Sequence, residues 1–311
     1  MKRVFRFFSY LTTVLLLLLH SCIGEDNTDC PPQNVRVYFA YRTTYSPGLL
    51  DPAEVNRFNL FVFDGNGKFI GEWIDESPSL SPLYYMELPL DYGTYSFVCW
   101  GGFTQDCYQA NPEAFIPGQT DINECMLRLK RTESNIIDHH PNHLFYARLD
   151  IAEVIRPGMN FTLDLKQITN TINVTTEGID FPEHTYSLYI EDDNGDHTFD
   201  NSCASLTKLR YISPCSKDKD GQPYGSLRVL SLNEQRPTPE LVLTNEITGK
   251  IFFSANLVEL ILKLREQGIT VDLEDIHTYD IHLKFMKVSD TDMDVQVSIN
   301  GWIINETLNE I

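Results

Sequence analysis

The sequence predicts a mostly β protein that consists of two tandem antiparallel β-sandwich domains and contains one helix. Three observations predict this fold class. Short runs rich in β-branched and aromatic residues recur about every 10 residues, a spacing typical of sandwiches rather than of βαβ units. Turn signals containing Gly, Asn and Asp separate these runs. The same pattern starts again near residue 167, and a chain of 311 residues is long enough for two domains of ordinary size.

Residues 1–21 have the features of an export signal. Lys2, Arg3 and Arg6 precede an apolar run over residues 11–19, which is shorter than the roughly 20 residues of a membrane-spanning helix. The run ends in Leu-His-Ser-Cys at 19–22, which resembles the lipobox of bacterial lipoproteins. We therefore predict cleavage before Cys22 and covalent attachment of diacylglycerol and an acyl chain to Cys22. The alternative is an ordinary cleaved signal with a chance cysteine.

Residues 22–33 are polar, acidic and contain proline, so they are predicted to form a short tether. Two or three lipid chains hold a protein firmly on a membrane, whereas one chain binds marginally. Acidic residues directly after the lipidated cysteine, here Glu25 and Asp26, resemble surface-export signals of some Gram-negative lipoproteins. We expect a lipid-anchored protein of the outer membrane, exposed at the cell surface.

Six cysteines remain when Cys22 is assigned to the lipid: Cys30, Cys99, Cys107, Cys125, Cys203 and Cys215. An even number in an exported chain favours disulfides, although six cysteines allow fifteen connectivities. Cys203 and Cys215 lie alone in the second half and close a short loop, so we predict that they pair. Cys30–Cys125 would tie the start of the first domain to a later strand, which leaves Cys99 with Cys107. Metal binding is the competing use, but the chain contains no C-x-x-C pair.

The first predicted domain spans residues 34–166. Its expected strands are 35–41, 58–63, 68–74, 93–100, 122–129, 143–149 and 160–166. The segment Asp-Gly-Asn-Gly at 64–67 supplies the positive φ that a tight hairpin needs.

The second predicted domain spans residues 167–311. Its expected strands are 167–176, 186–190, 226–232, 239–244, 248–253 and 293–302. A helix is predicted over 254–267, capped by Ser254 and ended by Gly268. In the last strand Val295, Val297 and Ile299 lie on one face, and Trp302 ends the strand.

The composition argues against a nucleic-acid partner. The formal charge is −20, and loss of the three basic signal residues changes it to −23. Phosphate binding needs clustered Lys and Arg, which this chain lacks.

Two segments have a spacing that metal ions use, but neither predicts a metal site. His139, His140 and His143 lie in a Pro-containing segment without a completing ligand, so a polar loop is the better interpretation. Alternating Asp and Asn at 192–196 resemble half of a calcium loop, but the final Glu is missing and a hairpin turn explains them better. A calcium site there stays a minor alternative. No nucleophile elbow, P-loop or His-Glu-x-x-His motif is present, so we predict no enzyme activity, no metal and no cofactor beyond the lipid.

Several short segments, in this order and spacing, together resemble the fimbrial anchor lipoproteins of the Bacteroidota. Beyond the lipobox they are Asp29–Pro31, Leu60–Asp64, Gly67–Phe69, Tyr92–Tyr95, Trp100–Gly102, Cys125-x-Leu-x-Leu129, Leu144–Tyr146, Thr169–Asn170 and Ile299–Trp302. The resemblance covers nearly the whole chain. Ala147 departs from it, because Gly is expected there.

The resemblance implies two transthyretin-like sandwiches, no catalysis, and attachment of a fimbrium to the outer membrane, with control of fimbrial length in some members. It also implies a disulfide between Cys30 and Cys125. Shaft subunits of this class lose an N-terminal strand and assemble by strand exchange. An anchor tethered at its N-terminus would keep its first strand and offer residues 293–311 to a shaft subunit, by strand exchange or edge pairing. Alternatively, 293–304 is simply the last strand of the second domain.

A second class of function is a surface lipoprotein that binds a glycan or another host ligand. Exposed aromatic residues on one face, such as Trp73, Tyr84 and Tyr85, would favour it. The alternative is that these residues belong to the core of alternating strands.

Overall fold

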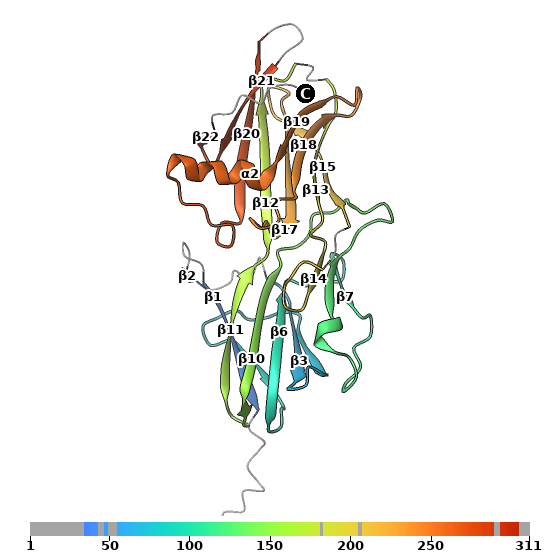
Figure 1. The fold of residues 1–311 in the computed structure, drawn as a ribbon, viewed down its shortest axis with the longest axis vertical. Coiled ribbons are helices and arrows are strands. Elements are labelled where there is room, and N and C mark those ends of the chain that lie inside the picture. The colour runs from blue at the N-terminus through green and yellow to red at the C-terminus, as the bar shows by residue number, and fades with distance from the viewer. Residues whose placement is uncertain are drawn as a thin grey trace, which may run out of the picture.

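The computed structural model describes residues 34–42, 47–48, 55–180, 183–204, 207–288 and 293–304. The predicted signal peptide, the lipidation site Cys22, the tether and Cys30 lie outside this range. Within it the chain is mostly β, and the strands form two elongated halves stacked end to end (Figure 1). No helix among these residues is both long and apolar enough to cross a bilayer.

The first half contains an eight-stranded sheet with the order β2-β1-β11-β10-β6-β3-β4, and β5 also pairs with β1. Its strands are β1 Val35–Arg42, β2 Pro47–Gly48, β3 Phe58–Asp64, β4 Phe69–Asp75, β5 Tyr85–Leu88, β6 Gly93–Gly101, β10 Phe145–Ile155 and β11 Asn160–Gln167. β10 and β11 pair at only two positions, so the sheet divides there into two layers. Alternate residues such as Val37, Leu60 and Phe97 fill the space between the layers.

The second half contains a six-stranded and a five-stranded sheet, with the orders β16-β17-β12-β20-β21-β22 and β19-β18-β13-β15-β9. The strands of the six-stranded sheet are β16 Ser216–Lys217, β17 Pro223–Leu230, β12 Thr169–Glu177, β20 Thr278–Lys287, β21 Met293–Ile299 and β22 Trp302–Ile304. Those of the five-stranded sheet are β19 Ile251–Asn256, β18 Glu240–Asn245, β13 Tyr186–Asp192, β15 Leu209–Pro214 and β9 Ile136–Ile137. The predicted mostly β fold of sandwich type is confirmed.

Three strand pairs are parallel, which corrects the purely antiparallel prediction. They are β1–β11, β12–β20 and β15–β9. Alternation of apolar and polar residues shows which face of a strand is buried, but it does not show which strand lies beside it. Parallel neighbours also need long crossover connections, which leave no local turn signal.

A third sheet connects the two halves. β7 Tyr108–Asn111 and β8 Met126–Leu129 come from the first half, and β14 Asp196–Thr198 comes from the second. In the opposite direction, β9 of the first half joins the five-stranded sheet of the second. A short 3-10 helix, η2 Ile122–Glu124, precedes β8.

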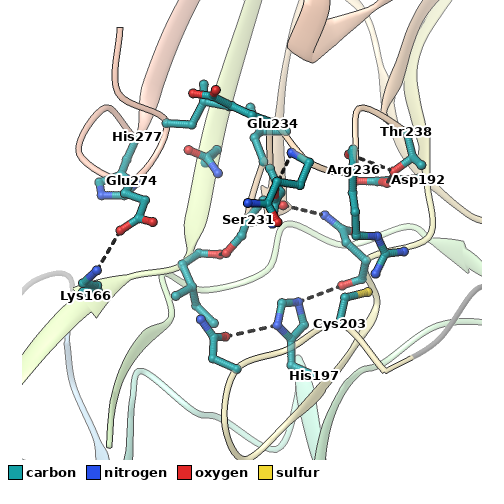
Figure 2. A pocket seen from close by; sticks show the side chains of 18 of the residues that line it. Lys166, Asp192, His197, Cys203, Ser231, Glu234, Arg236, Thr238, Glu274 and His277 are labelled. Carbon is teal, nitrogen blue, oxygen red and sulfur yellow. Dashed lines mark hydrogen bonds and ion pairs between the residues drawn. The ribbon is translucent and has the colours of Figure 1, made fainter.

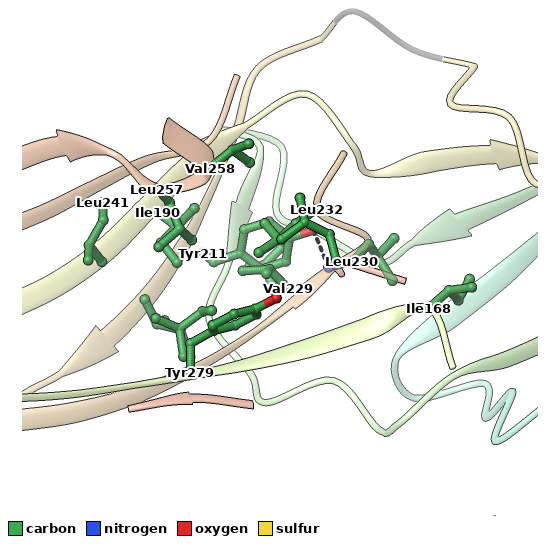
Figure 3. Close-up of a cluster of buried hydrophobic side chains, with 14 of the residues drawn as sticks. Ile168, Ile190, Tyr211, Val229, Leu230, Leu232, Leu241, Leu257, Val258 and Tyr279 are labelled. Carbon is green, nitrogen blue, oxygen red and sulfur yellow. Dashed lines mark hydrogen bonds between the residues drawn. The ribbon is translucent and has the colours of Figure 1, made fainter. Parts of the chain in front are cut away.

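One apolar core runs through both halves. It contains Trp100 and Leu129 from the first half together with Ile172 and Tyr279 from the second. Figure 3 shows part of it, where Tyr211 packs among aliphatic side chains. Sheet membership changes between β11, which ends at Gln167, and β12, which starts at Thr169. This change lies next to the predicted boundary of 166/167, but the shared strands and shared core connect the two halves, and the division into domains stays a prediction.

The helix begins later than the sequence suggests. α2 spans Leu257–Leu262 and continues as the 3-10 helix η3 Lys263–Gln267. Asn256 is the cap, because its side chain accepts a hydrogen bond from the Glu259 amide at 2.9 Å. Ser254 still pairs with Val242 in β19, so the predicted Ser254 cap is wrong. Gly268 ends the helical segment at φ 78°, as predicted.

The two predicted turns have different outcomes. The 64–67 segment joins β3 to β4 with Gly67 at φ 75°, and the Asp64 carboxylate accepts hydrogen bonds from the amides of Asn66 and Lys68. The 193–196 segment is not a hairpin, because β13 pairs with β15 and β18 while β14 pairs with β8.

Candidate functional site

The first described strand, β1, is built into its sheet on both sides. It pairs in parallel with β11 over six positions and antiparallel with β5 over four. Val35 and Val37 are fully buried. The sandwich of the first half is therefore completed by the chain's own N-terminal strand.

The predicted C-terminal strand is also part of the fold. β21 pairs with β20 over seven positions. Val297 and Ile299 are fully buried and Val295 is nearly so, and all three belong to the shared core. Among the described residues this arrangement agrees with the interpretation of 293–304 as part of the second half's own sheet, although the segment forms two strands rather than one.

A tight turn then forms the edge of the six-stranded sheet. Asn300 and Gly301 both have positive φ, 51° and 84°, which is the geometry of a two-residue hairpin. The following strand β22 pairs with β21 over three positions and is the last strand of the sheet. Trp302 is 54% exposed and Ile303 49% exposed.

The side chain of Gln267 contacts the open side of this edge. Gln267 Nε2 donates a hydrogen bond of 2.7 Å to the Ile303 carbonyl oxygen. Edge strands offer unpaired backbone groups to other chains, so β22 has the chemistry needed to pair with a strand from another subunit. Residues 305–311, the rest of the segment predicted for assembly, lie outside the described residues.

Two predicted disulfides are wrong. Cys99, Cys107 and Cys215 carry free thiols. Cys99 belongs to the core between the layers of the first half, whereas Cys107 belongs to the shared core on the other face of the sheet. The short sequence separation of Cys99 and Cys107 does not show that the two thiols lie on opposite faces of the sheet.

The other wrong pair lies at opposite ends of β13. The Cys203 thiol donates to the Asp193 carbonyl at 3.3 Å, and the Cys215 amide donates to the Tyr186 carbonyl at 3.0 Å. The intervening strand separates these ends by about 20 Å, far beyond the reach of a disulfide.

Cys125, the predicted partner of Cys30, is buried, and its thiol donates to the Asp121 carbonyl at 3.2 Å. Burial and the nearby carboxylates of Asp121 and Glu124 raise the pKa of the Cys125 thiol to about 12. Because Cys30 lies outside the described residues, the Cys30–Cys125 bond stays a prediction.

The histidine segment lies where the two halves meet. The ring of His143 contacts Thr169 and Gln167 through Nδ1 at 3.3 Å and 3.1 Å. Burial, together with the nearby Arg228, lowers the pKa of His143 to about 4. The described residues contain no group of three His, Cys, Asp or Glu side chains placed to hold a metal ion.

The side chains of the 192–196 segment are engaged with protein partners. Thr238 donates to the Asp192 carboxylate at 2.6 Å, and Arg236 pairs with Asp193 at 2.6 Å. Arg131 binds Asp196 through two nitrogens at 3.0 and 3.1 Å. Burial raises the pKa of Asp192 to about 6.

Four of these residues, Asp192, Asp193, Arg236 and Thr238, border a cavity of about 560 Å³ between the two halves (Figure 2). Its wall includes Asp192, Ser231, Arg236 and His277, whereas no Phe, Tyr or Trp of the described chain lines it. Neither ring nitrogen of His277 has a hydrogen-bond partner among the described residues. Lys166 and Glu274 form an ion pair of 2.7 Å at the cavity. The sequence does not predict this site, because its residues come from four separate segments and form no motif.

The predicted aromatic face does not form a platform. Trp73 packs against the core of the first half, and Tyr84 stacks on Phe58 at a ring-centroid distance of 5.9 Å. Tyr85 is 37% exposed and lies under the Arg36 guanidinium. Trp73 and Tyr84 therefore follow the core interpretation, whereas Tyr85 stays exposed.

A comparison with protein families decides the family. The profile of the fimbrillin-A associated anchor proteins Mfa1 and Mfa2 matches residues 27–307. The chain belongs to this family of fimbrial anchor proteins. The predicted resemblance is therefore confirmed, and the family is a fimbrial one rather than an enzyme family.

Individual proteins similar to this chain agree with this assignment. The chain is 27% identical to the minor fimbrium anchoring subunit Mfa2 of Porphyromonas gingivalis over 290 residues, which cover 90% of this chain and 88% of that protein. The solved structure of the fimbrial anchor protein Mfa2 from the same organism is 26% identical, with a TM-score of 0.74 over 88% of this chain and 99% of that one. A Bacteroides thetaiotaomicron structure described as a candidate polysaccharide-binding protein is 25% identical, with a TM-score of 0.71 over 87% and 97% of the two chains.

Proposed function

We propose that this protein is a non-enzymatic fimbrial anchor that attaches a fimbrium to the outer membrane through lipid on Cys22. The observation that carries the proposal is the position of β1, which completes its own sheet with Val35 and Val37 buried. A subunit that keeps its first strand retains the N-terminal segment to which lipid would be attached. Membership of the anchor family supports the same role.

The lipid supplies the mechanical link in this proposal. Each buried methylene contributes about 0.8 kcal/mol, so the two or three chains of a lipoprotein cysteine resist extraction where one chain would not. Because such a subunit is fixed in the membrane, its addition would also end fimbrial growth from the base. Control of fimbrial length is therefore part of the proposal.

The proposed contact with the shaft is the C-terminal edge. β22 presents Ile303 and Trp302 at the open side of the six-stranded sheet. A shaft subunit would pair there by edge pairing, or would receive residues 305–311 by strand exchange. Deletion of 305–311 separates these modes, because full shaft attachment after the deletion would exclude exchange of that segment.

The test of the anchor role is Cys22→Ala in the native host. We expect the variant to release fimbriae that carry this protein into the medium, because the tether no longer ends in lipid. Fractionation with antibodies against the shaft and against this protein measures the release. Fimbriae that stay on the cell, with this protein never copurifying, would contradict the proposal.

A second candidate function is binding of a glycan. The cavity between the halves favours it, because hydrogen-bonding side chains such as Asp193, Arg236 and His277 line it, and a relative with a similar fold is described as a candidate polysaccharide-binding protein. A screen of the mature protein against an oligosaccharide array tests this candidate. Binding that Arg236→Gln abolishes would support it, whereas binding unchanged by Arg236→Gln would place the glycan elsewhere.

A further inference from the structure

The lower end of the first half carries exposed apolar side chains. Tyr92 is 71% exposed, Val154 57%, Ile70 38% and Met159 37%. Large apolar side chains scattered singly on a surface need no explanation. These four, which we call the tip patch, lie next to the end of β10 and the starts of β4, β6 and β11. Figure 1 shows these strand ends together at the lower end of the first half.

The strand register brings the tip patch together. Ile70 and Tyr92 line the same shallow hollow beside the 64–67 turn. Gly93, next to Tyr92, pairs with Ile155, next to Val154. The patch therefore spans the turns at the lower ends of β3, β6 and β10.

The chain enters the fold at this same end. The amide of Arg36, near the start of β1, donates to the Met159 carbonyl at 3.0 Å. β1 and β11 run in parallel from this point. The tether that would lead from Cys22 to Asn34 therefore joins the molecule beside the tip patch.

We propose that the tip patch rests in the interfacial layer of the bilayer that holds the lipidated Cys22. This inference depends on the proposed lipid anchor and deepens it by assigning the surface that faces the membrane. The occupant is a lipid surface because the tether enters at the patch. Tyrosine is a side chain that favours the membrane interface.

The tether alone would not fix this orientation. Its residues 22–33 span up to about 40 Å when fully extended, so the body could stand well away from the bilayer. Four partly exposed apolar side chains bind a membrane weakly by themselves. Once the lipid keeps them near the surface, the high effective concentration makes the weak contact sufficient.

The charge of the protein indicates which lipid to use. The mature chain carries −23, and the patch is flanked by Asp91 and Glu153 as well as Arg156. Anionic headgroups would repel such a surface. The test therefore uses phosphatidylcholine vesicles.

The experiment is hydroxyl-radical footprinting of the lipidated full-length mature protein in these vesicles, with the Cys22→Ala mature protein free in solution as reference. Tyr92 and Met159 are the probes. Tyr224 and Met286, 43% and 40% exposed in the second half, are matched controls. We expect oxidation of both probes to fall at least roughly threefold on the vesicles because contact with lipid excludes water, with both controls unchanged.

A paired variant strengthens the test. The double variant Tyr92→Ser/Val154→Ser should restore oxidation of Met159 on vesicles. The control double variant Tyr224→Ser/Val288→Ser, in the second half, should leave Met159 protected. If the vesicles change the oxidation of probes and controls by the same factor in the wild type, the proposal is overturned. Protection that rises with the protein-to-lipid ratio would also overturn it, because a second copy would then be the occupant.

The same samples separate this inference from the anchor proposal. Mass spectrometry of the N-terminal peptide reports lipid on Cys22, and flotation reports attachment to the vesicles. If Cys22 carries lipid and the protein floats with unprotected probes, the tip inference fails and the anchor stands. If Cys22 carries no lipid, the anchor proposal itself fails.

Discussion

A buried ion pair joins the two halves of the chain. Arg131, from the first half, binds Asp196 through two nitrogens, and the Asp196 side chain is 6% exposed. Removal of Arg131 would leave the buried Asp196 charge with only the longer contact to Arg128 at 3.9 Å. Arg131→Met should therefore lower the free energy of unfolding by about 3 kcal/mol, measured by urea denaturation. Arg36→Met, which breaks an exposed pair with Glu87, is the control and should change it by less than about 1 kcal/mol.

Burial of Asp192 predicts a dependence of stability on pH. Its pKa rises from 3.8 to about 6 because of burial. Since the folded-state pKa lies above the unfolded-state value, protonation of Asp192 stabilises the folded protein. This contribution is fully present below about pH 4 and is lost as the pH rises to about 6. Asp192→Asn should therefore gain up to about 3 kcal/mol relative to wild type between pH 4 and pH 7.

Urea denaturation at intervals of one pH unit measures this difference. Asp220→Asn is the control, because its side chain is 70% exposed and its curve should run parallel to that of the wild type. Parallel wild-type and Asp192→Asn curves would contradict the assigned burial effect.

At the scale of elements, the C-terminal hairpin distinguishes a built-in strand from a donated one. Ile299 in β21 is fully buried, whereas Ile303 in β22 is 49% exposed. Ile299→Ala should lower the free energy of unfolding of the isolated subunit by about 2–4 kcal/mol, and Ile303→Ala by less than about 1 kcal/mol. Equal, small effects in urea denaturation would mean that β21 does not stabilise its own subunit.

The helix cap is a second prediction at this scale. Asn256 accepts the Glu259 amide, while Ser254 remains in β19. Asn256→Ala should lower the free energy of unfolding by about 1 kcal/mol. Ser254→Ala, compared in the same urea titrations, should have less than half that effect. A larger loss of unfolding free energy in Ser254→Ala than in Asn256→Ala would instead support Ser254 as the cap.

The elements also show what a sequence can and cannot reveal. β21 was predictable because burial alternates along its seven residues, whereas β3 and β6 were predictable because they are continuous runs of seven and nine residues rich in β-branched and aromatic side chains. β9 and β14 have two and three residues, too few to form a periodic pattern, so their pairing with the other half left no signal. The cavity was missed for a related reason, because Asp192, Arg236 and His277 meet only through the tertiary fold.

At the scale of the whole molecule, each half contributes a strand to a sheet of the other half, and these strands connect the two halves mechanically. β14 of the second half extends the sheet of β7 and β8, and β9 of the first half extends the sheet of β15. A load applied to the C-terminal edge would therefore reach the N-terminal tether through hydrogen-bonded strands and a common core, not only through the 167–169 connection. Such coupling suits a subunit proposed to hold a fimbrium against a membrane.

This coupling predicts that the halves unfold together. Trp100 and Ile299 belong to the same core although they lie in different halves. Ile299→Ala should therefore accelerate amide hydrogen exchange in β6, at Phe97–Trp100, by the same factor as in β20, because both strands would open only in global unfolding. Mass spectrometry of exchanged peptides measures both strands in one experiment, with Ile303→Ala as the control. Faster exchange in β20 alone would show that the second half opens independently, and the shared core would then not transmit load between the shaft and the tether.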